Sequence, residues 1–172
     1  MSAGEIESVN FHPSPLPRYR GPYPLVQAIL DDQTEWGATC HKLAAEFDTG
    51  DILAQRIFPM TPDECHESLD LKTQVAMSKL ASDVALNFEP LWSAAYPQID
   101  GHYVGLWSDV ERTLDFTKTT LQLDRQLRAF GNLDCIAWFM GCGFTSSKRW
   151  FGRRRMHCHR ERLCFHLLCA WL

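Results

Sequence analysis

The chain has 172 residues with a formal net charge of −4; 45% of them are hydrophobic and 22% are charged, as is ordinary for a soluble globular protein. The start, MSAGEIESVN, lacks the basic and apolar regions of a secretory signal, and the late apolar run LCFHLLCAWL is too short to span a bilayer. We therefore expect a cytoplasmic protein that has no membrane partner and keeps its seven cysteines reduced.

Short apolar runs separated by turn-forming residues occupy the first sixty residues. We predict a strand end at 6–11, a helix at 23–31, and strands at 36–43 and 51–59 that are joined through a turn at 47–50. The loop at 12–22 contains four prolines. It should be extended, because the residue before each proline avoids helical backbone angles.

A longer helix is predicted next. Thr61, Pro62 and Glu64 have the spacing of a capping box with proline at the first helical position, so this helix should begin there and run to about Asn87. Pro90 should interrupt it. Its apolar stripe is best explained by core packing and comprises Leu69, Thr73, Ala76, Leu80, Val84 and Phe88.

The order strand, helix, strand, strand, helix predicts an α/β fold. Two or three strands make a poor doubly wound sheet, since they leave an edge unpaired and part of the long helix uncovered. We therefore expect an incomplete doubly wound sheet that represents the C-terminal half of a domain.

Asn10, His12 and Asp48 are the candidates for chemistry. Asn10 and His12 lie two residues apart in extended chain, so their side chains point the same way and could hold a carbonyl oxygen and move a proton. Asp48, in the turn between the two later strands, could orient the imidazole or a water. On these residues alone, a capped loop and an ordinary hairpin turn remain the alternative interpretation.

Several motifs resemble the folate-dependent formyltransferases, a family that includes methionyl-tRNA and amino-sugar formyltransferases. The residues at 10–21, NFHPSPLPRYRG, resemble the signature loop of that family, and FDTGDILAQ at 47–55 resembles a second motif. Asp48 follows Asn10 at the separation that the family shows. With the weaker likeness of 112–116 and 125–131 to the linker of the tRNA branch, the resemblance covers about residues 4–137.

The resemblance implies a Rossmann-like fold and the transfer of a formyl group from 10-formyltetrahydrofolate to an amine. Asn10 would stabilise the oxyanion, His12 would shuttle a proton and Asp48 would orient the imidazole and a water. The Leu16–Pro17 bond would be cis. The pterin would be bordered by Phe47, Asp48, Thr49, Gly50 and Asp51, and the acceptor by Ser14, Arg18, Arg20 and Gly21.

Other histidines are assigned to packing or to the surface, among them His41, His66 and His102. No metal is predicted, because the cysteines and histidines after Met156 fit no standard zinc spacing.

Residues 138–172 differ from the rest of the chain in charge. They contain seven Lys or Arg and one Asp or Glu, whereas residues 1–137 contain ten and twenty. They have no alternating strand pattern, so we interpret them as a basic, Cys-rich tail that is out of frame or unstructured. The predicted divisions are therefore a catalytic half at 1–95, a linker at 96–137 and this tail.

Two classes of function remain open. The first is a formyltransferase half with weak or absent activity on its own, because the front of the sheet that should enclose the folate is missing. The second is a non-catalytic remnant or dimerising module. A homodimer or a complementing chain would cover the open sheet edge. A small amine such as an amino sugar is preferred over tRNA as acceptor.

Overall fold

Two compact units make up the chain, Met1–Leu106 and Trp107–Leu172. The computed structural model describes residues 7–139, 142–147 and 155–158. No helix in these described ranges is both long and apolar enough to cross a membrane. The elements of the first unit are β1 (Val9–His12), α1 (Pro24–Leu30), β2 (Glu35–Lys42), β3 (Ile52–Pro59), α2 (His66–Leu86) and α3 (Phe88–Ser93).

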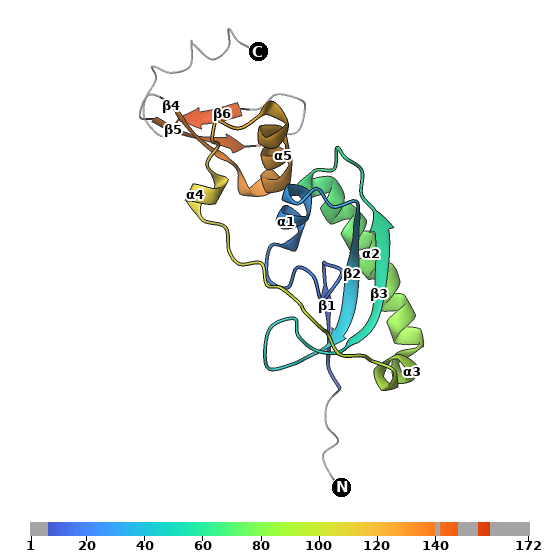
Figure 1. Ribbon diagram of the computed structural model, residues 1–172. Helices are drawn as coiled ribbons and strands as arrows, with labels where there is room; N and C mark the ends of the chain where they lie inside the picture. Colours follow the sequence, from blue (N-terminus) through green and yellow to red (C-terminus); the bar gives the residue numbers. More distant parts are fainter. Residues whose placement is uncertain (1–6, 140–141, 148–154, 159–172) are drawn as a thin grey trace. The chain divides into compact units, whose positions relative to one another are not determined.

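The first unit is built on one sheet with the strand order β1-β2-β3. Both pairings are antiparallel, and the register places Asn10 opposite His41 and His12 opposite Thr39. Helix α2 contacts β2 and β3 and runs along one face of the sheet (Figure 1). The α/β prediction is confirmed for this unit, and the predicted strands and first helix are found within a few residues of their expected ends.

Helix α2 buries the stripe that the sequence predicted, namely Leu69, Thr73, Ala76, Leu80 and Val84. Three of these residues form a core cluster with Ala38, Cys40 and Leu53 of the sheet. The predicted sixth member, Phe88, lies in α3 and packs against this cluster while only partly buried.

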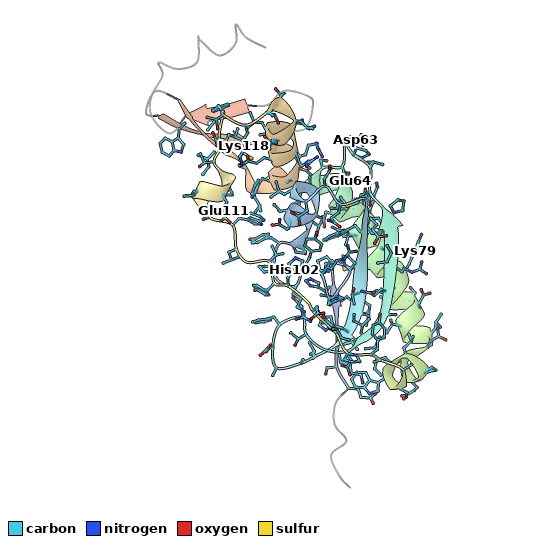
Figure 2. All side chains as sticks on the ribbon, in the orientation of Figure 1. Asp63, Glu64, Lys79, His102, Glu111 and Lys118 are labelled. Carbon is cyan, nitrogen blue, oxygen red and sulfur yellow. The ribbon has the colours of Figure 1, made fainter. Side chains whose placement is uncertain are left out.

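The start of α2 differs from the prediction. The helix begins at His66, and Cys65, whose N–H donates to Ser68 Oγ (3.1 Å), is its N-cap. The Glu64 carboxylate accepts long hydrogen bonds from Thr61, but it is buried and also bonded by Lys72 Nζ (2.5 Å) and by Ser68. The Thr61–Glu64 pair therefore closes a turn before the helix, and Figure 2 shows Glu64 beside the start of α2.

Residues 96–104, which were expected to belong to a linker, are hydrogen-bonded to the rest of the first unit. Ile52 N–H donates to the carbonyl of Tyr96 (2.8 Å), and Arg20 N–H donates to that of His102 (3.0 Å). Val104 N–H returns a bond to the carbonyl of Arg20 (2.6 Å). This segment therefore holds the loop after β1 in place, and Figure 2 labels His102 within it.

The second unit contains α4 (Asp109–Arg112), α5 (Thr120–Phe130), the 3-10 helix η1 (Gly131–Leu133), β4 (Ile136–Phe139), β5 (Cys142–Ser147) and β6 (Arg155–Cys158). Its strands form an antiparallel sheet in the order β4-β5-β6. Strands β5 and β6 differ from our expectation of a tail without strands, because backbone pairing does not require an alternating apolar pattern. The first two residues of the expected tail, Trp138 and Phe139, lie in β4, and residues 140–141, 148–154 and 159–172 lie outside the described ranges.

Candidate active site

The loop after β1 is anchored to the sheet by buried polar groups. Thr39 Oγ1 donates to the carbonyl of Ser14 (2.7 Å) and accepts from Leu16 N–H (3.1 Å). Gln55 Nε2 donates to the carbonyl of Leu16 (2.6 Å) and to Thr39 Oγ1 (2.8 Å). The Leu16–Pro17 peptide bond is cis, as the resemblance implied. These contacts hold the loop against the face of the sheet that lies opposite α2.

Four polar side chains meet on that face, and we call them the polar cluster: Asn10, His12, His41 and Asp48. Three of them surround one carboxylate oxygen, Asp48 Oδ1. Asn10 Nδ2 lies 3.4 Å from it, His12 Nδ1 3.5 Å and His41 Nε2 3.6 Å. The structure therefore brings together the three residues that the sequence selected and adds His41.

Asp48 is held from two further directions. Its backbone has φ +57°, a left-handed conformation that is uncommon for a residue with a Cβ. Gly21 N–H donates to Asp48 Oδ2 (2.9 Å), and Gln98 Nε2 donates to the Asp48 carbonyl (2.9 Å). Gln98 Nε2 also donates to the carbonyl of Gly50 (2.7 Å). These bonds stabilise the turn in the geometry that directs the carboxylate at Asn10.

His12 is buried, and its ring has one defined donor. Nε2 lies 2.9 Å from the carbonyl of Tyr19, which can only accept, so Nε2 carries the hydrogen. Burial lowers the pKa of His12 from its ordinary value, against the opposing effects of the Tyr19 carbonyl and Asp48. A neutral His12 therefore presents the lone pair of Nδ1 toward Asp48.

His41 has the opposite arrangement. Its Nδ1 lies 2.8 Å from the carbonyl of Lys42 and so carries the hydrogen, while Nε2 lies 3.3 Å from Asn10 Nδ2 and accepts. The sequence predicted a packing or surface role for His41; the side chain is 2% exposed, but it packs within the polar cluster. Its position two residues after Thr39, on the same face of the strand, is the signal that could have identified it.

The residues expected at the acceptor side have other partners. Ser14 is buried and donates from Oγ to the carbonyl of Arg18 (2.9 Å). The Arg18 guanidinium, in turn, pairs with Glu35 (3.2 Å) at the surface. Arg20 donates from Nε (3.0 Å) and Nη2 (2.9 Å) to Gln98 Oε1. Among the four, only Gly21, which has φ +103°, contacts the polar cluster directly.

The loop expected to border the pterin exposes Phe47, whereas Asp48, Thr49 and Asp51 are half-buried and Gly50 is buried. Phe47 is 84% exposed, and Thr49 Oγ1 donates to the carbonyl of Glu46 (3.0 Å). A Cβ on Gly50 would lie 1.8 Å from the carbonyl oxygen of Lys42, so no other residue fits there without a backbone shift. Asp51 lies 3.9 Å from Lys42 Nζ. Apart from Asp48, these residues shape and flank the turn.

The polar cluster combines the groups that acyl-type chemistry needs. An amide donor can stabilise charge on a carbonyl oxygen, and a neutral imidazole lone pair can accept a proton. A carboxylate beside that imidazole can stabilise its protonated form. Gln98, which was not among the candidates selected from the sequence, holds the backbone of the Asp48 turn from fifty residues away.

A family model described as formyl transferase matches residues 2–85. The chain is 33% identical over 126 residues to the methionyl-tRNA formyltransferase of Coprothermobacter proteolyticus, covering 73% of this chain and 41% of the relative. It is 36% identical over 143 residues to that of Janthinobacterium sp. (strain Marseille), covering 83% of this chain and 45% of the relative. The chain thus spans less than half the length of these relatives.

Solved structures share the fold at lower identity. HypX from Aquifex aeolicus, in complex with tetrahydrofolic acid, gives a TM-score of 0.74 at 22% identity. The match covers 84% of the present chain and 26% of the HypX chain. The N-formyltransferase from Helicobacter canadensis, in complex with folinic acid and dTDP-3-aminofucose, gives a TM-score of 0.64 at 22% identity. This match covers 84% of the present chain and 56% of the H. canadensis chain. The expected formyltransferase-type, Rossmann-like fold class is thereby confirmed.

Proposed function

Because a formyl transferase family model matches residues 2–85, we propose that the polar cluster serves the transfer of a formyl group from 10-formyltetrahydrofolate to an amine. The observation that carries the proposal is that Asn10 Nδ2 and His12 Nδ1 both lie within 3.5 Å of one carboxylate oxygen, Asp48 Oδ1. A capped loop and a plain hairpin turn would not require this convergence.

Asn10 is the oxyanion donor in this proposal. When the amine attacks the formyl carbon, the carbonyl oxygen becomes negative, and an amide N–H aimed at it stabilises the tetrahedral intermediate. Asn10 lies in β1 and is paired with β2, so its amide is oriented before the substrate arrives.

His12 accepts the proton that the attacking amine loses. Its free lone pair is on Nδ1, 3.5 Å from Asp48 Oδ1, so the carboxylate stabilises the imidazolium that forms. The proton then moves to the folate nitrogen as the bond between that nitrogen and the formyl carbon breaks. Asp48 accepts from Nδ1 while the ring is protonated and so orients the imidazolium.

The loop of residues 47–51 is the proposed folate-binding wall. The exposed Phe47 ring offers an apolar surface for the pterin, and Gly50 allows the loop to approach the backbone of β2. Tetrahydrofolic acid and folinic acid in the two neighbouring structures support a reduced folate as the co-substrate.

Two acceptors are proposed in order. From the sequence, a small amine was expected as the acceptor. The match to a methionyl-tRNA formyltransferase, however, covers 83% of the chain and therefore continues through α5. This favours the amino group of an aminoacyl-tRNA. A nucleotide-linked amino sugar is the second candidate, because a neighbour of the same fold holds dTDP-3-aminofucose.

The test combines binding with turnover. Calorimetry with folinic acid measures folate binding, and the release of tetrahydrofolate from the 10-formyl form measures transfer to methionyl-tRNA or to a dTDP-amino sugar. Asn10→Ala should lower transfer by about 10²–10³-fold with little effect on folate binding. The surface change Asp70→Asn, on the exposed side of α2, is the control.

The outcome also decides between the two classes of function. Activity of the chain alone is expected to be weak, so folate binding is the more sensitive measurement. If the chain binds no folate, transfers no formyl group and elutes as a dimer, the dimerising module replaces the enzyme. Folate binding without transfer instead supports an enzyme half that needs a complementing chain.

A further inference from the structure

His41 occupies a fixed position at the centre of the polar cluster. It lies in β2 directly opposite Asn10 in the antiparallel register, and it is only 2% exposed. Side chains that face each other across an antiparallel pair are close neighbours on one face of the sheet. The ring is therefore held beside the Asn10 amide by the backbone pairing of the two strands.

The tautomer of a neutral His41 is determined by its other ring nitrogen, Nδ1. Since Nδ1 donates to the carbonyl of Lys42 (2.8 Å), a neutral His41 must carry a lone pair on Nε2. That lone pair lies 3.3 Å from Asn10 Nδ2. His41 is thus an acceptor for Asn10, whereas His12 has its hydrogen on Nε2 and its lone pair on Nδ1.

The Asn10 amide has two hydrogens and two neighbouring acceptors. One hydrogen points to His41 Nε2 and the other to Asp48 Oδ1, 3.4 Å away. The Asp48 carboxylate can give up the Asn10 hydrogen bond once His12 is protonated, because His12 Nδ1 then donates to Oδ1, while Oδ2 keeps the bond from Gly21 N–H (2.9 Å). His41 has no such freedom, since its tautomer leaves Nε2 only the role of acceptor.

We propose that His41 is a positioning residue of this site: its Nε2 lone pair holds one amide hydrogen of Asn10 and so directs the other to the developing oxyanion. The inference rests on the proposed formyl transfer for its consequence in catalysis. The hydrogen-bonding arrangement itself is a property of the chain without substrate. It can therefore be measured separately.

Two variants separate the acceptor from the bulk of the ring. Gln at position 41 can place a side-chain oxygen near the Nε2 position and accept from Asn10, while Met fills a similar volume and offers only a weak sulfur acceptor. His41→Gln should keep kcat within about threefold, and His41→Met should lower kcat about tenfold with an unchanged KM for folate, since the lost bond acts in the transition state.

The spectroscopic arm uses the wild-type chain. Nitrogen-15 NMR of the imidazoles should report His41 with its hydrogen on Nδ1 and His12 with its hydrogen on Nε2, which are opposite tautomers. The Asn10 side-chain amide resonances should shift in His41→Met and stay close to wild type in His41→Gln. A His41 that carries its hydrogen on Nε2, or Asn10 resonances that are the same in all three proteins, would overturn the proposal.

The two readouts keep the failure of each proposal distinct. If the chain binds no folate and neither wild type nor variant transfers a formyl group, while the tautomers are as stated, the proposed function fails and the positioning of Asn10 stands. If transfer occurs and His41→Gln is as slow as His41→Met, His41 does not act through its acceptor. The positioning proposal then fails alone.

Discussion

The two faces of the β1-β2-β3 sheet use the same strands for different purposes. Toward α2 the strands present Phe11, Ala38 and Cys40, and toward the loops they present Asn10, His12, His41 and Thr39. Burial raises the pKa of the Cys40 thiol to about 11, so this residue packs as a small neutral side chain. The α2 face therefore depends on volume, whereas the loop face depends on donors and acceptors that match.

This difference explains why the faces should tolerate substitution differently. An apolar core loses stability in proportion to the volume and area removed. A buried polar face loses stability whenever one partner is left without a hydrogen bond, even when the volume is conserved. Four substitutions or conditions test the comparison, in order of the expected change in the free energy of unfolding.

The largest change is expected from Leu80→Ala on α2. Leu80 is 1% exposed within the apolar cluster, so its truncation should lower the free energy of unfolding by about 2–5 kcal/mol. Urea denaturation measures this. Leu86→Ala is the matched control, because Leu86 ends the same helix and is 83% exposed. Equal losses in the two variants would mean that the α2 face is not the core.

Thr39→Val is expected to come next, although it conserves volume. Its hydroxyl donates to the Ser14 carbonyl and accepts from Leu16 N–H and Gln55 Nε2. Leu16 N–H and the Ser14 carbonyl also bond each other (3.1 Å), so the change removes three buried hydrogen bonds but leaves this pair, at a cost of about 1–3 kcal/mol. Thr73→Val is the control on the other face, since Thr73 Oγ1 bonds only the carbonyl of Leu69 within its own helix. A Thr39→Val protein as stable as wild type would contradict the expected dependence of the loop face on hydrogen bonds.

Gln98→Met tests the segment that holds the Asp48 turn. The change removes the hydrogen bonds to the carbonyls of Asp48 and Gly50 and to Arg20, so it should cost about 1–2 kcal/mol and broaden the resonances of residues 47–51. Gln74→Met is its control, because Gln74 makes one exposed bond to Asp70. An unchanged loop in Gln98→Met would show that other contacts suffice to hold Asp48.

The smallest effect is the pH dependence from His12. Its pKa in the folded chain is lowered by burial, so the unfolded chain binds the proton first as the pH falls below its ordinary value of 6.5. The free energy of unfolding should therefore fall with acidification until the folded His12 also protonates. His12→Gln should lose less stability than wild type between about pH 7.5 and 5.5. Equal losses of the free energy of unfolding in both proteins over this pH range would contradict a buried, neutral His12.

Local patterns were sufficient for much of the α/β order and for the three catalytic candidates. The spacing of apolar residues on α2 identified its buried face, and extended chain around Asn10 placed it beside His12. Such features depend on neighbours within a few residues. The capping box at Thr61 misplaced the start of α2, because Cys65 and Ser68 cap the helix and Glu64 is bonded by Lys72.

Contacts between distant residues were decided only by the tertiary structure. His41 joins the polar cluster through strand pairing 31 residues from Asn10, and Gln98 reaches the Asp48 turn from 50 residues away. Gln98 leaves no signal in its local sequence that separates it from an ordinary surface residue. For His41, the alternation of β2 indicates only which face of the strand it occupies, not that Asn10 lies opposite it. The residue types at β1 and in the 47–51 turn were thus readable from the sequence, while the orientation of their hydrogens required the neighbours that folding brings together.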